Sequence, residues 1–452
     1  MIGEEKQVPY TAMETNTATK LILIAKIARE KREEKFISLM HLLNAEYFYE
    51  CFKELKKRKA AGIDGRIVES YTDDEIKQIL KQTVADIKQK RYHPKPVRSV
   101  DIAKDNGKVR KLGIPTVVDK VVQLAITKIL KAIYEQNFLD VSYGYRSGRD
   151  AHSCLKTINH MIMQKKVNWI IDADIKGFFD NIDHTWMVKC LEQRIKDPNF
   201  TSLILRFLKA GIMHEKIKEE TEKGTPQGGI ISPVLANIYL HYVLDIWFER
   251  QERKKMTGYT ELIRYADDFV IGAQHQGEAT QILVDLTERL NKFGLELSLE
   301  KTKVIEFGRF AKENQTKRGR GKPETFDFLG FTHYCSTTRD GRFVVKVETS
   351  SKKLDKSIKG MKTWLKSVRN RKQLKEIWPL LKVKLQGHYN YYGVSGNLEG
   401  LKQYYKQTRN LLFKWINRRS QKKTWNWGSF ERHLSHYPIP QPKLTYAIYH
   451  TW

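Results

Sequence analysis

This chain has few cysteines, no long apolar runs and fewer acidic than basic residues, and each of these features excludes some classes of protein. The four cysteines, Cys51, Cys154, Cys190 and Cys335, lie far apart and form no Cys-x-x-Cys pair. This spacing favours isolated buried thiols of a reducing compartment over a disulfide framework or a zinc site. We therefore expect a cytoplasmic protein.

Long apolar runs are missing as well. No stretch reaches the roughly 18 apolar residues that a helix needs to span a bilayer. The apolar segment at 21–27 is too short for a signal peptide, and charged residues follow it closely. We expect neither a membrane span nor a membrane partner.

Acidic residues are strongly outnumbered by basic ones. The 452 residues include 52 Asp and Glu against 81 Lys and Arg, which leaves a net charge of +29. An excess of this size is typical of a protein that binds a polyanion, with nucleic acid as the first candidate. The hydrophobic content of 40% is sufficient for buried cores, and the length suits about three domains.

Periodicity along the chain predicts a mixture of helices and strands. The helices expected in the first 300 residues lie at 21–58 (two helices), 73–90, 117–134, 232–253 and 279–293. The expected strands lie at 97–102, 109–112, 169–175 and 260–273, where the first two form a hairpin and the last is itself a hairpin. Residues 308–322 are rich in Gly, Lys and Arg, which predicts a loop or an insertion.

The character of the sequence changes beyond Val347. Three helices dense in Lys and Arg, with interleaved Trp and Tyr, are expected at about 351–371, 373–391 and 398–419. We therefore place a domain boundary near Val347. Residues 421–452 are expected to form an irregular closing segment to which no chemistry can be assigned.

The most informative motif is the adjacent acidic pair Asp267 and Asp268. Apolar β-formers flank the pair on both sides, which predicts a strand–turn–strand. Two neighbouring like charges repel unless a cation lies between them, and Mg²⁺ prefers oxygen ligands and shares its shell with substrate phosphates. A solvated hairpin tip is the simpler interpretation, but the rest of the chain argues against it.

A second acidic strand end contains Asp172, Asp174 and Asp180. A polymerase that uses two metal ions needs a carboxylate from one strand beside a carboxylate pair on a neighbouring hairpin. Asp174 fits that role beside Asp267 and Asp268. Asp172 shares a strand face with Asp174 by alternation, so spacing alone does not separate these two acids.

Together these residues resemble the group II intron maturase family of reverse transcriptases, over roughly residues 40–415. Four motifs appear in the family's order, at 174–184, 224–238, 265–268 (Tyr-Ala-Asp-Asp) and 328–331. Each alone could arise by chance, whereas the ordered set is highly specific. The implied fold is an α+β right-hand polymerase.

The resemblance also implies a domain plan and an activity. The plan has a flexible tail at 1–20, a helical N-terminal extension at 21–58, fingers and palm at 59–347, a three-helix thumb or X domain at 348–420, and a short segment at 421–452. The activity would be RNA-directed DNA polymerisation by two-metal-ion nucleotidyl transfer. The partners would be dNTPs, an RNA template, the RNA/DNA duplex and a structured intron RNA whose splicing the protein assists.

In this resemblance Asp174, Asp267 and Asp268 would bind two Mg²⁺ ions, for which Mn²⁺ could substitute. Phe179 would be the ring beside the sugar 2′ position that excludes ribonucleotides, and a plain core aromatic is the alternative. Phe178 is favoured as the core member of the pair, because alternate strand residues face opposite ways.

Further residues would bind the incoming nucleotide. Lys104 and Arg110, six apart on the 97–112 hairpin, would grip the triphosphate, although solvated fingertip residues are the alternative. Gln227 would line the nucleotide pocket. Lys301 would lie near the leaving pyrophosphate, with Lys303 as a competitor for that role.

The remaining residues would contact template and primer. Arg146 would contact a template phosphate, and Tyr265 would lie at the template–primer. Lys352, Lys356 and Lys359 belong to a helix whose basic residues cover most of its circumference, which suits the backbone of a duplex. A solvated helix face is the alternative.

Many family members carry a DNA-binding region and an HNH endonuclease with paired Cys-x-x-Cys motifs after the thumb. This chain ends soon after Arg419 without those cysteines, so we expect that it does not cut a DNA target itself. That departure slightly favours a second hypothesis, a domesticated reverse transcriptase that uses a dedicated RNA in phage defence or repair. A third hypothesis is an RNA-binding splicing factor with a vestigial polymerase site, and the intact acidic residues argue against it.

Overall fold

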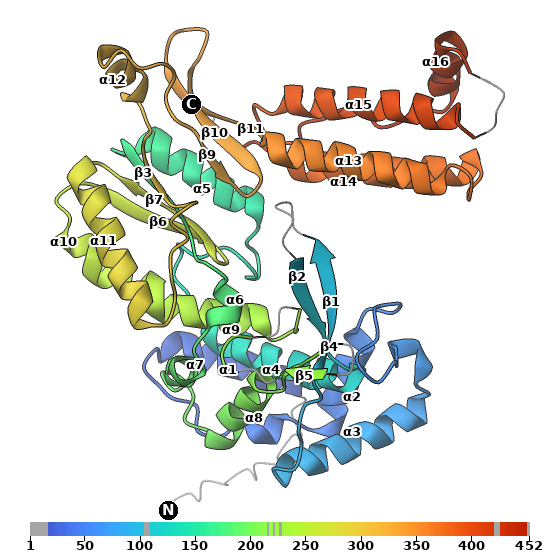
Figure 1. Ribbon diagram of the computed structural model, residues 1–452. Helices are drawn as coiled ribbons and strands as arrows, with labels where there is room; N and C mark the ends of the chain where they lie inside the picture. Colours follow the sequence, from blue (N-terminus) through green and yellow to red (C-terminus); the bar gives the residue numbers. More distant parts are fainter. Residues whose placement is uncertain are drawn as a thin grey trace, which may run out of the picture. The chain divides into compact units, whose positions relative to one another are not determined.

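The structure is a computed structural model that describes residues 17–103, 109–214, 217–219, 222–225, 228–419 and 425–449 (Figure 1). The chain forms two compact units, each made of several segments. The first contains residues 1–148, 175–251 and 286–297, and the second contains residues 149–174, 252–285 and 298–452. Most of the tail predicted at 1–20 lies outside the described residues.

The first unit is mainly helical and contains one small sheet. Its helical elements are α1 (Thr17–Glu30), η1 (Met40–Leu42), α2 (Ala45–Glu54), η2 (Val68–Ser70), α3 (Asp73–Lys88), α4 (Val117–Tyr134), α6 (Phe178–Asn181), α7 (His184–Leu191), α8 (Pro198–Leu208), α9 (Ser232–Leu240) and η3 (His241–Asp245). Its strands are β1 (Val97–Ala103), β2 (Val109–Ile114), β4 (Ile212–His214) and β5 (Ile217–Glu219), in the order β2-β1-β4-β5. The helices predicted at 21–58, 73–90 and 117–134 and the hairpin at 97–112 are confirmed.

The single helix predicted over 232–253 is interrupted. After α9 the chain forms two π-helical turns, η3 and η4 (Phe248–Glu252), before the short α10 (Arg253–Lys255). A π turn is a local widening of the hydrogen-bond ladder, and apolar periodicity carries no signal for it.

The described part of the second unit contains two antiparallel sheets. The first has the order β6-β7-β3-β8 and the second the order β11-β10-β9. The strands are β3 (Trp169–Asp174), β6 (Thr260–Tyr265), β7 (Asp268–Ala273), β8 (Lys303–Glu306), β9 (Phe326–Phe328), β10 (Phe331–Thr337) and β11 (Phe343–Thr349). The helices that lie wholly within this unit are α5 (Ala151–Gln164), α10, α12 (Ala311–Lys317), α13 (Ser351–Val368), α14 (Leu374–Tyr392), α15 (Leu398–Ile416) and α16 (Trp427–His436).

The sheet β6-β7-β3-β8 is covered on both faces. The neighbouring residues Ile170 and Ile171 of β3 point to opposite faces, and neither is exposed to solvent. The predicted strand at 169–175 and hairpin at 260–273 are both confirmed. The helix expected at 279–293 is α11 (Gln276–Lys292), which runs from one unit into the other.

A loop or an insertion was predicted at residues 308–322. The segment contains the helix α12, which that prediction did not include. The buried carboxylate of Glu306 accepts hydrogen bonds from Asn314 (2.7 Å), Gln315 (3.1 Å) and Arg318 (2.9 Å). These contacts hold α12 against the end of β8. They depend on tertiary structure, so a segment without apolar periodicity is not recognised as a helix from its sequence.

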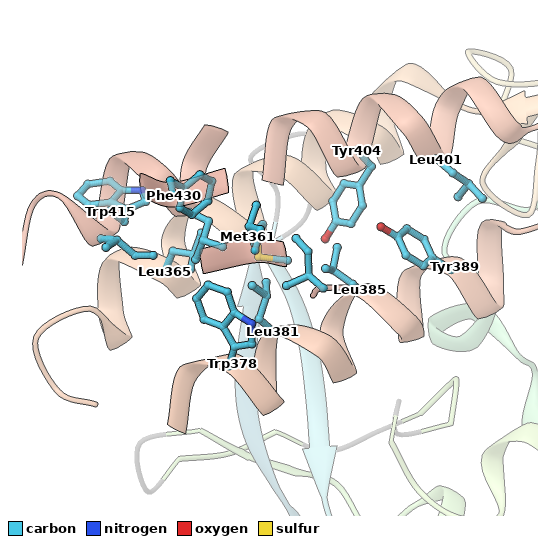
Figure 2. Close-up of a cluster of buried hydrophobic side chains, with 14 of the residues drawn as sticks. Met361, Leu365, Trp378, Leu381, Leu385, Tyr389, Leu401, Tyr404, Trp415 and Phe430 are labelled. Atoms are coloured by element: carbon cyan, nitrogen blue, oxygen red, sulfur yellow. The ribbon is translucent and has the colours of Figure 1, made fainter. Parts of the chain in front are cut away.

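The three predicted basic helices are confirmed as α13, α14 and α15. They share an apolar core, in which Met361, Leu381 and Leu401 are buried (Figure 2). These helices belong to the same compact unit as the sheet β6-β7-β3-β8, so the boundary expected near Val347 does not separate the two units.

The closing segment is more regular than predicted. It contains α16, which Asn426 caps by accepting a hydrogen bond from the Ser429 backbone. Phe430 of α16 is fully buried in the core of α13–α15 (Figure 2), and the Trp427 ring stacks on Phe413 with centroids 4.0 Å apart. The aromatic residues of this segment therefore have a packing role.

The last described residues return to the rest of the second unit. Tyr446 forms a β-bridge with Val394 and stacks on His152 of α5, with ring centroids 3.8 Å apart. Ile448 is buried in a cluster with Leu155 and Phe331. The C-terminal segment thus joins the end of α14 to α5 and β10.

Two expectations from composition can be compared with the structure. Cys51, Cys154 and Cys190 are buried free thiols and Cys335 is a partly buried one, as predicted. Among the described helices, none has both the length and the apolar character needed to cross a membrane.

Candidate active site

The three predicted catalytic acids come together within the second unit. Antiparallel pairing of β3 with β7 places Asp174 directly opposite Asp268. Asp267 immediately precedes Asp268 in the turn between β6 and β7, where Tyr265 pairs with Asp268. Ala266 has a φ of 58°, a left-handed conformation that non-glycine residues rarely adopt and that is often found at functional sites.

The register also distinguishes Asp174 from the other two acids of its segment. Asp172 lies opposite Val270 and Lys303, two residue pairs further from the β6–β7 turn than Asp174 on the same strand face. Asp180 lies beyond the strand, on α6 of the first unit. Of the three, only Asp174 is the strand partner of Asp268.

Two of the acids at this site, Asp268 and Asp172, have raised pKa values. Partial burial, followed by the like charges of Asp267 and Asp174, raises the pKa of Asp268 to about 6, although its side chain keeps contact with solvent. Burial and the charge of Asp268 raise the pKa of Asp172 to about 7. Nearby cations oppose the shift at Asp268, chiefly Lys301 and then Lys353.

The chemistry of these side chains fits a divalent cation. Carboxylate oxygens are the ligands that Mg²⁺ prefers, and the raised pKa of Asp268 records a repulsion that a bound cation would relieve. In the described part of the chain, no three His, Cys, Asp or Glu side chains are already gathered as a metal-ligand cluster. The fit therefore depends on donor chemistry and strand register.

Lys301 lies at this site, as its predicted role requires. Its Nζ is 2.7 Å from Asp174 Oδ2, and its side chain is 64% exposed. The turn that carries it is attached to the strand end, because the Ser298 backbone donates a hydrogen bond to the Asp174 carbonyl. Lys303, the competing candidate, is paired in register with Asp172.

Phe179 and Phe178 lie on the short helix α6 in the first unit, and the argument from strand alternation was therefore wrong. Gly177, with a φ of 56°, ends the extended segment and begins the helical turn. The two rings meet edge to face at 5.3 Å, with Phe178 2% and Phe179 9% exposed. Phe178 is the more buried member of the pair, as expected, but helix geometry decides this.

The segment 224–238 packs closely against two neighbouring elements of the first unit. The Thr225 backbone donates a hydrogen bond to the Phe179 carbonyl, and a Cβ on Gly224 would lie only 2.8 Å from that oxygen. A Cβ on Gly228 would lie 2.7 Å from the Gly113 carbonyl of β2. Glycine is required at these two positions because the backbones approach so closely.

Two of the predicted nucleotide-binding residues, Lys104 and Gln227, lie outside the described residues. Arg110 lies on β2, where its backbone pairs with Ile102. The packing of Gly228 on β2 brings the segment that follows Gln227 close to the strand that carries Arg110.

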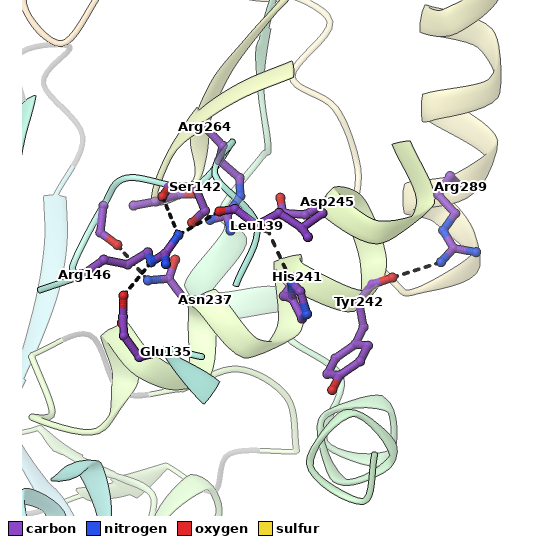
Figure 3. Close-up of polar contacts among 12 residues, drawn as sticks. Glu135, Leu139, Ser142, Arg146, Asn237, His241, Tyr242, Asp245, Arg264 and Arg289 are labelled. Carbon is purple, nitrogen blue, oxygen red and sulfur yellow. Dashed lines mark hydrogen bonds and ion pairs between the residues drawn. The ribbon is translucent and has the colours of Figure 1, made fainter. Parts of the chain in front are cut away.

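Arg146 does not have the free guanidinium that a template contact requires. It donates hydrogen bonds to Glu135 (2.8 Å), to the Leu139 carbonyl (2.7 Å) and to the Ser142 carbonyl (2.9 Å), as Figure 3 shows. Its side chain is only 6% exposed. Nε and Nη1 of Arg146 are thus used inside the first unit, which gives this residue a structural role there.

The predicted duplex-binding lysines lie on the outer face of α13. Lys352, Lys356 and Lys359 are exposed, whereas Leu354 and Met361 face the core of the three helices. Tyr265, the other predicted contact, is partly buried where β6 ends.

Two residues near the acids were not selected from the sequence. The charge of Lys353, in the first turn of α13, offsets part of the rise in the pKa of Asp268. Burial raises the pKa of Tyr391 to about 12, with smaller contributions that include Tyr265 and Asp268. The Tyr391 hydroxyl donates to the Leu329 carbonyl in the segment 328–331.

Comparisons with known proteins show the family to which the chain belongs. Residues 102–333 match the family described as reverse transcriptase (RNA-dependent DNA polymerase). The group II intron-encoded protein LtrA of Lactococcus lactis subsp. cremoris is 31% identical, over 84% of this chain and 74% of LtrA. Protein YkfC of Escherichia coli K12 is 34% identical, over 47% of this chain and 64% of YkfC.

A fungal protein is also similar. The uncharacterized 91 kDa protein in the cob intron of Schizosaccharomyces pombe is 36% identical, over 44% of this chain and 24% of that protein. The fold and the match define an RNA-directed DNA polymerase of the right-hand class. The chain belongs to the family of group II intron-encoded reverse transcriptases and maturases.

Proposed function

We propose that Asp174, Asp267 and Asp268 are the catalytic carboxylates with which this RNA-directed DNA polymerase extends a primer on an RNA template. The observation that carries the proposal is the register of β3 and β7, which places Asp174 opposite Asp268 beside the turn residue Asp267. Two strands and one turn thus supply three carboxylates to one end of a sheet.

The three acids would hold two Mg²⁺ ions, with Mn²⁺ as a substitute. When bound, the ions would supply activation of the primer 3′-hydroxyl and stabilisation of the leaving pyrophosphate. Lys301, which is ion-paired with Asp174, would bind phosphate oxygens of the nucleotide. The positive charge of Lys301 favours the ionised form of the neighbouring carboxylates, and it would favour the ionised form of a bound triphosphate in the same way.

Four further residues would contact the incoming nucleotide. Lys104 and Arg110 would bind the triphosphate from the β1–β2 hairpin, and Gln227 would line the pocket. Phe179 would exclude ribonucleotides. Its backbone is held by Thr225, so that the ring is carried by two packed segments.

The helices α13–α15 would act as the thumb, and 59–347 as fingers and palm, with α1 and α2 as the N-terminal extension. Lys352, Lys356 and Lys359 would follow the backbone of the RNA/DNA duplex, with Tyr265 near the primer end. Contacts of this kind carry no sequence information, which suits a polymerase that copies any template.

The protein would also bind its host intron RNA and assist splicing. Supporting this are the names of its relatives, which include an intron-encoded protein and a protein in the cob intron. Sequencing of RNA that copurifies with the protein tests this partner. Enrichment of one structured intron supports it, whereas enrichment of a separate small RNA would favour the domesticated role.

Primer extension on an RNA template with Mg²⁺ tests the catalytic assignment. Asp267→Ala should reduce the rate by more than the roughly 10- to 100-fold cost of losing an outer-shell partner of a metal. Asp180→Ala, which removes an exposed acid of the same sequence region, is the matched control and should extend normally. Equal extension by the parent and by Asp267→Ala would show that the site is assigned wrongly.

A further inference from the structure

A second site is suggested by the insertion that contains α12, away from the carboxylates. Glu306, only 5% exposed, accepts hydrogen bonds from three side chains of the segment 314–318. These contacts fix one wall of a cavity of about 780 Å³ in the second unit. The opposite wall is formed by β10, β11 and their connecting turn.

The cavity has the size of a small-ligand site, for which volumes of roughly 300–1,000 Å³ are typical. Its lining contains aromatic rings, hydroxyls and cations, among them Arg309, Phe310, Lys312, Ser336 and Phe343. None of the catalytic carboxylates lines it. The cavity, which we name the α12 cavity, is therefore not part of the polymerase site.

The charges around the α12 cavity favour an anionic ligand. Lys317 is paired with Glu313, and Arg342 with Asp340. Arg309 and Lys312, in contrast, are exposed and have no ion-pair or hydrogen-bond partner for their side chains among the described residues. Arg320 and Lys322, which follow α12 in the sequence, are exposed and add positive charge to this segment.

An exposed aromatic ring lies between the two unpaired cations in the sequence. Phe310 is 52% exposed, although a ring of this size is usually buried. An aromatic face beside cations is the arrangement with which proteins bind single-stranded nucleic acid, because every base can stack and every phosphate is charged. RNA fits best, because the proposed function already requires an RNA partner.

We propose that the α12 cavity binds an unpaired nucleotide of single-stranded RNA. The base stacks on Phe310, and the flanking phosphates bind Arg309 and Lys312. This inference rests on the proposed function for the identity of the polyanion. It adds a site that holds RNA outside the polymerase centre, where unpaired positions of a structured RNA are available.

The test uses the full-length protein saturated with an unlabelled RNA/DNA template–primer. Binding of fluorescein-labelled (U)12 RNA to this complex is then measured by anisotropy over a range of KCl concentrations. Phe310→Ala should weaken binding about 5- to 150-fold, the equivalent of one lost base stack. Arg309→Gln with Lys312→Gln should reduce the salt slope of log K by about 1.4, at roughly 0.7 per phosphate contact.

A matched control changes the same charge elsewhere. Lys254→Gln with Lys292→Gln alters two exposed lysines that do not line the cavity, and its salt slope should stay that of the wild type. A second measurement uses the same oligonucleotide with 4-thiouridine, which should crosslink within 309–317. A crosslink there supports the proposal, and crosslinks confined to other segments would overturn it.

Two results separate this proposal from the polymerase assignment. If the loaded wild type does not bind (U)12, or if the Phe310 and Arg309/Lys312 variants bind it equally well, the α12 cavity is not an RNA site. The same preparations are assayed for primer extension on an RNA template. If primer extension is normal and the variants bind (U)12 as the wild type does, only the proposed RNA site in the α12 cavity is overturned. If the wild type does not extend a primer, the proposed function is overturned.

Discussion

Replacing Arg146 tests whether this residue holds the fold or touches the template. Arg146→Ala leaves the Glu135 carboxylate and the carbonyls of Leu139 and Ser142 without their donor. Breaking a buried ion pair by removing one partner costs roughly 3–5 kcal/mol. Glu135 keeps 20% of its exposure, which screens the loss, so we expect a cost of about 3 kcal/mol.

For a unit of this size, 1 kcal/mol shifts Tm by roughly 2–4 °C, so Arg146→Ala should lower the melting temperature of the first unit by roughly 6–12 °C. The dependence of duplex affinity on salt should not change, since no phosphate contact is lost. Lys352→Ala is the opposite case. It is exposed and proposed to bind phosphate, so it should leave Tm unchanged and reduce the salt slope by roughly 0.7–0.9.

Differential scanning fluorimetry and duplex binding at several salt concentrations measure both quantities on the same preparations. The reasoning fails if Arg146→Ala melts like the wild type while its salt slope falls by about one contact. That result would return Arg146 to the template-binding role predicted from sequence.

Three further changes are predicted. Phe179→Ala should raise the ratio of ribonucleotide to deoxynucleotide kcat/KM, and an unchanged ratio removes Phe179 from sugar selection. Burial lowers the pKa of His388 to about 4. The unfolded chain therefore binds a proton at His388 before the folded protein does, and the folded protein should lose up to about 3 kcal/mol of stability as pH falls from 6.5 to 4. His388→Phe should flatten that part of the pH–stability curve, and a parallel curve would contradict the cause. Ile448→Ala should cost roughly 2–5 kcal/mol in chemical unfolding, against at most about 0.5 for the exposed Leu444→Ala, and equal costs would show that the C-terminal segment does not pack as described.

Much of the fold was predictable because the signals are local. The two helices in 21–58, the β1–β2 hairpin and the helices α13–α15 follow from apolar spacing and turn residues within each segment. The β6–β7 hairpin followed in the same way from adjacent acids flanked by apolar β-formers.

Other features depend on residues far apart in the chain. The helix α12 is held by Glu306, and α16 by burial of Phe430 in a core made by three other helices. The segment of α12 has no apolar periodicity, and α16 has a capping residue, Asn426, but is only 10 residues long. Contacts of this kind stabilise a helix that its own sequence does not specify.

The sequence by itself determined which acids, cations and aromatic rings are available, and in which order the polymerase motifs occur, because composition and spacing are properties of the chain alone. Only the tertiary structure decided that Asp174 is opposite Asp268, whereas Asp172 is two residue pairs further away, since strand register is set by pairing between distant segments. The tertiary structure likewise placed Arg146 in an internal network. A charged side chain binds a ligand or the protein itself according to what surrounds it, and folding brings those surroundings together.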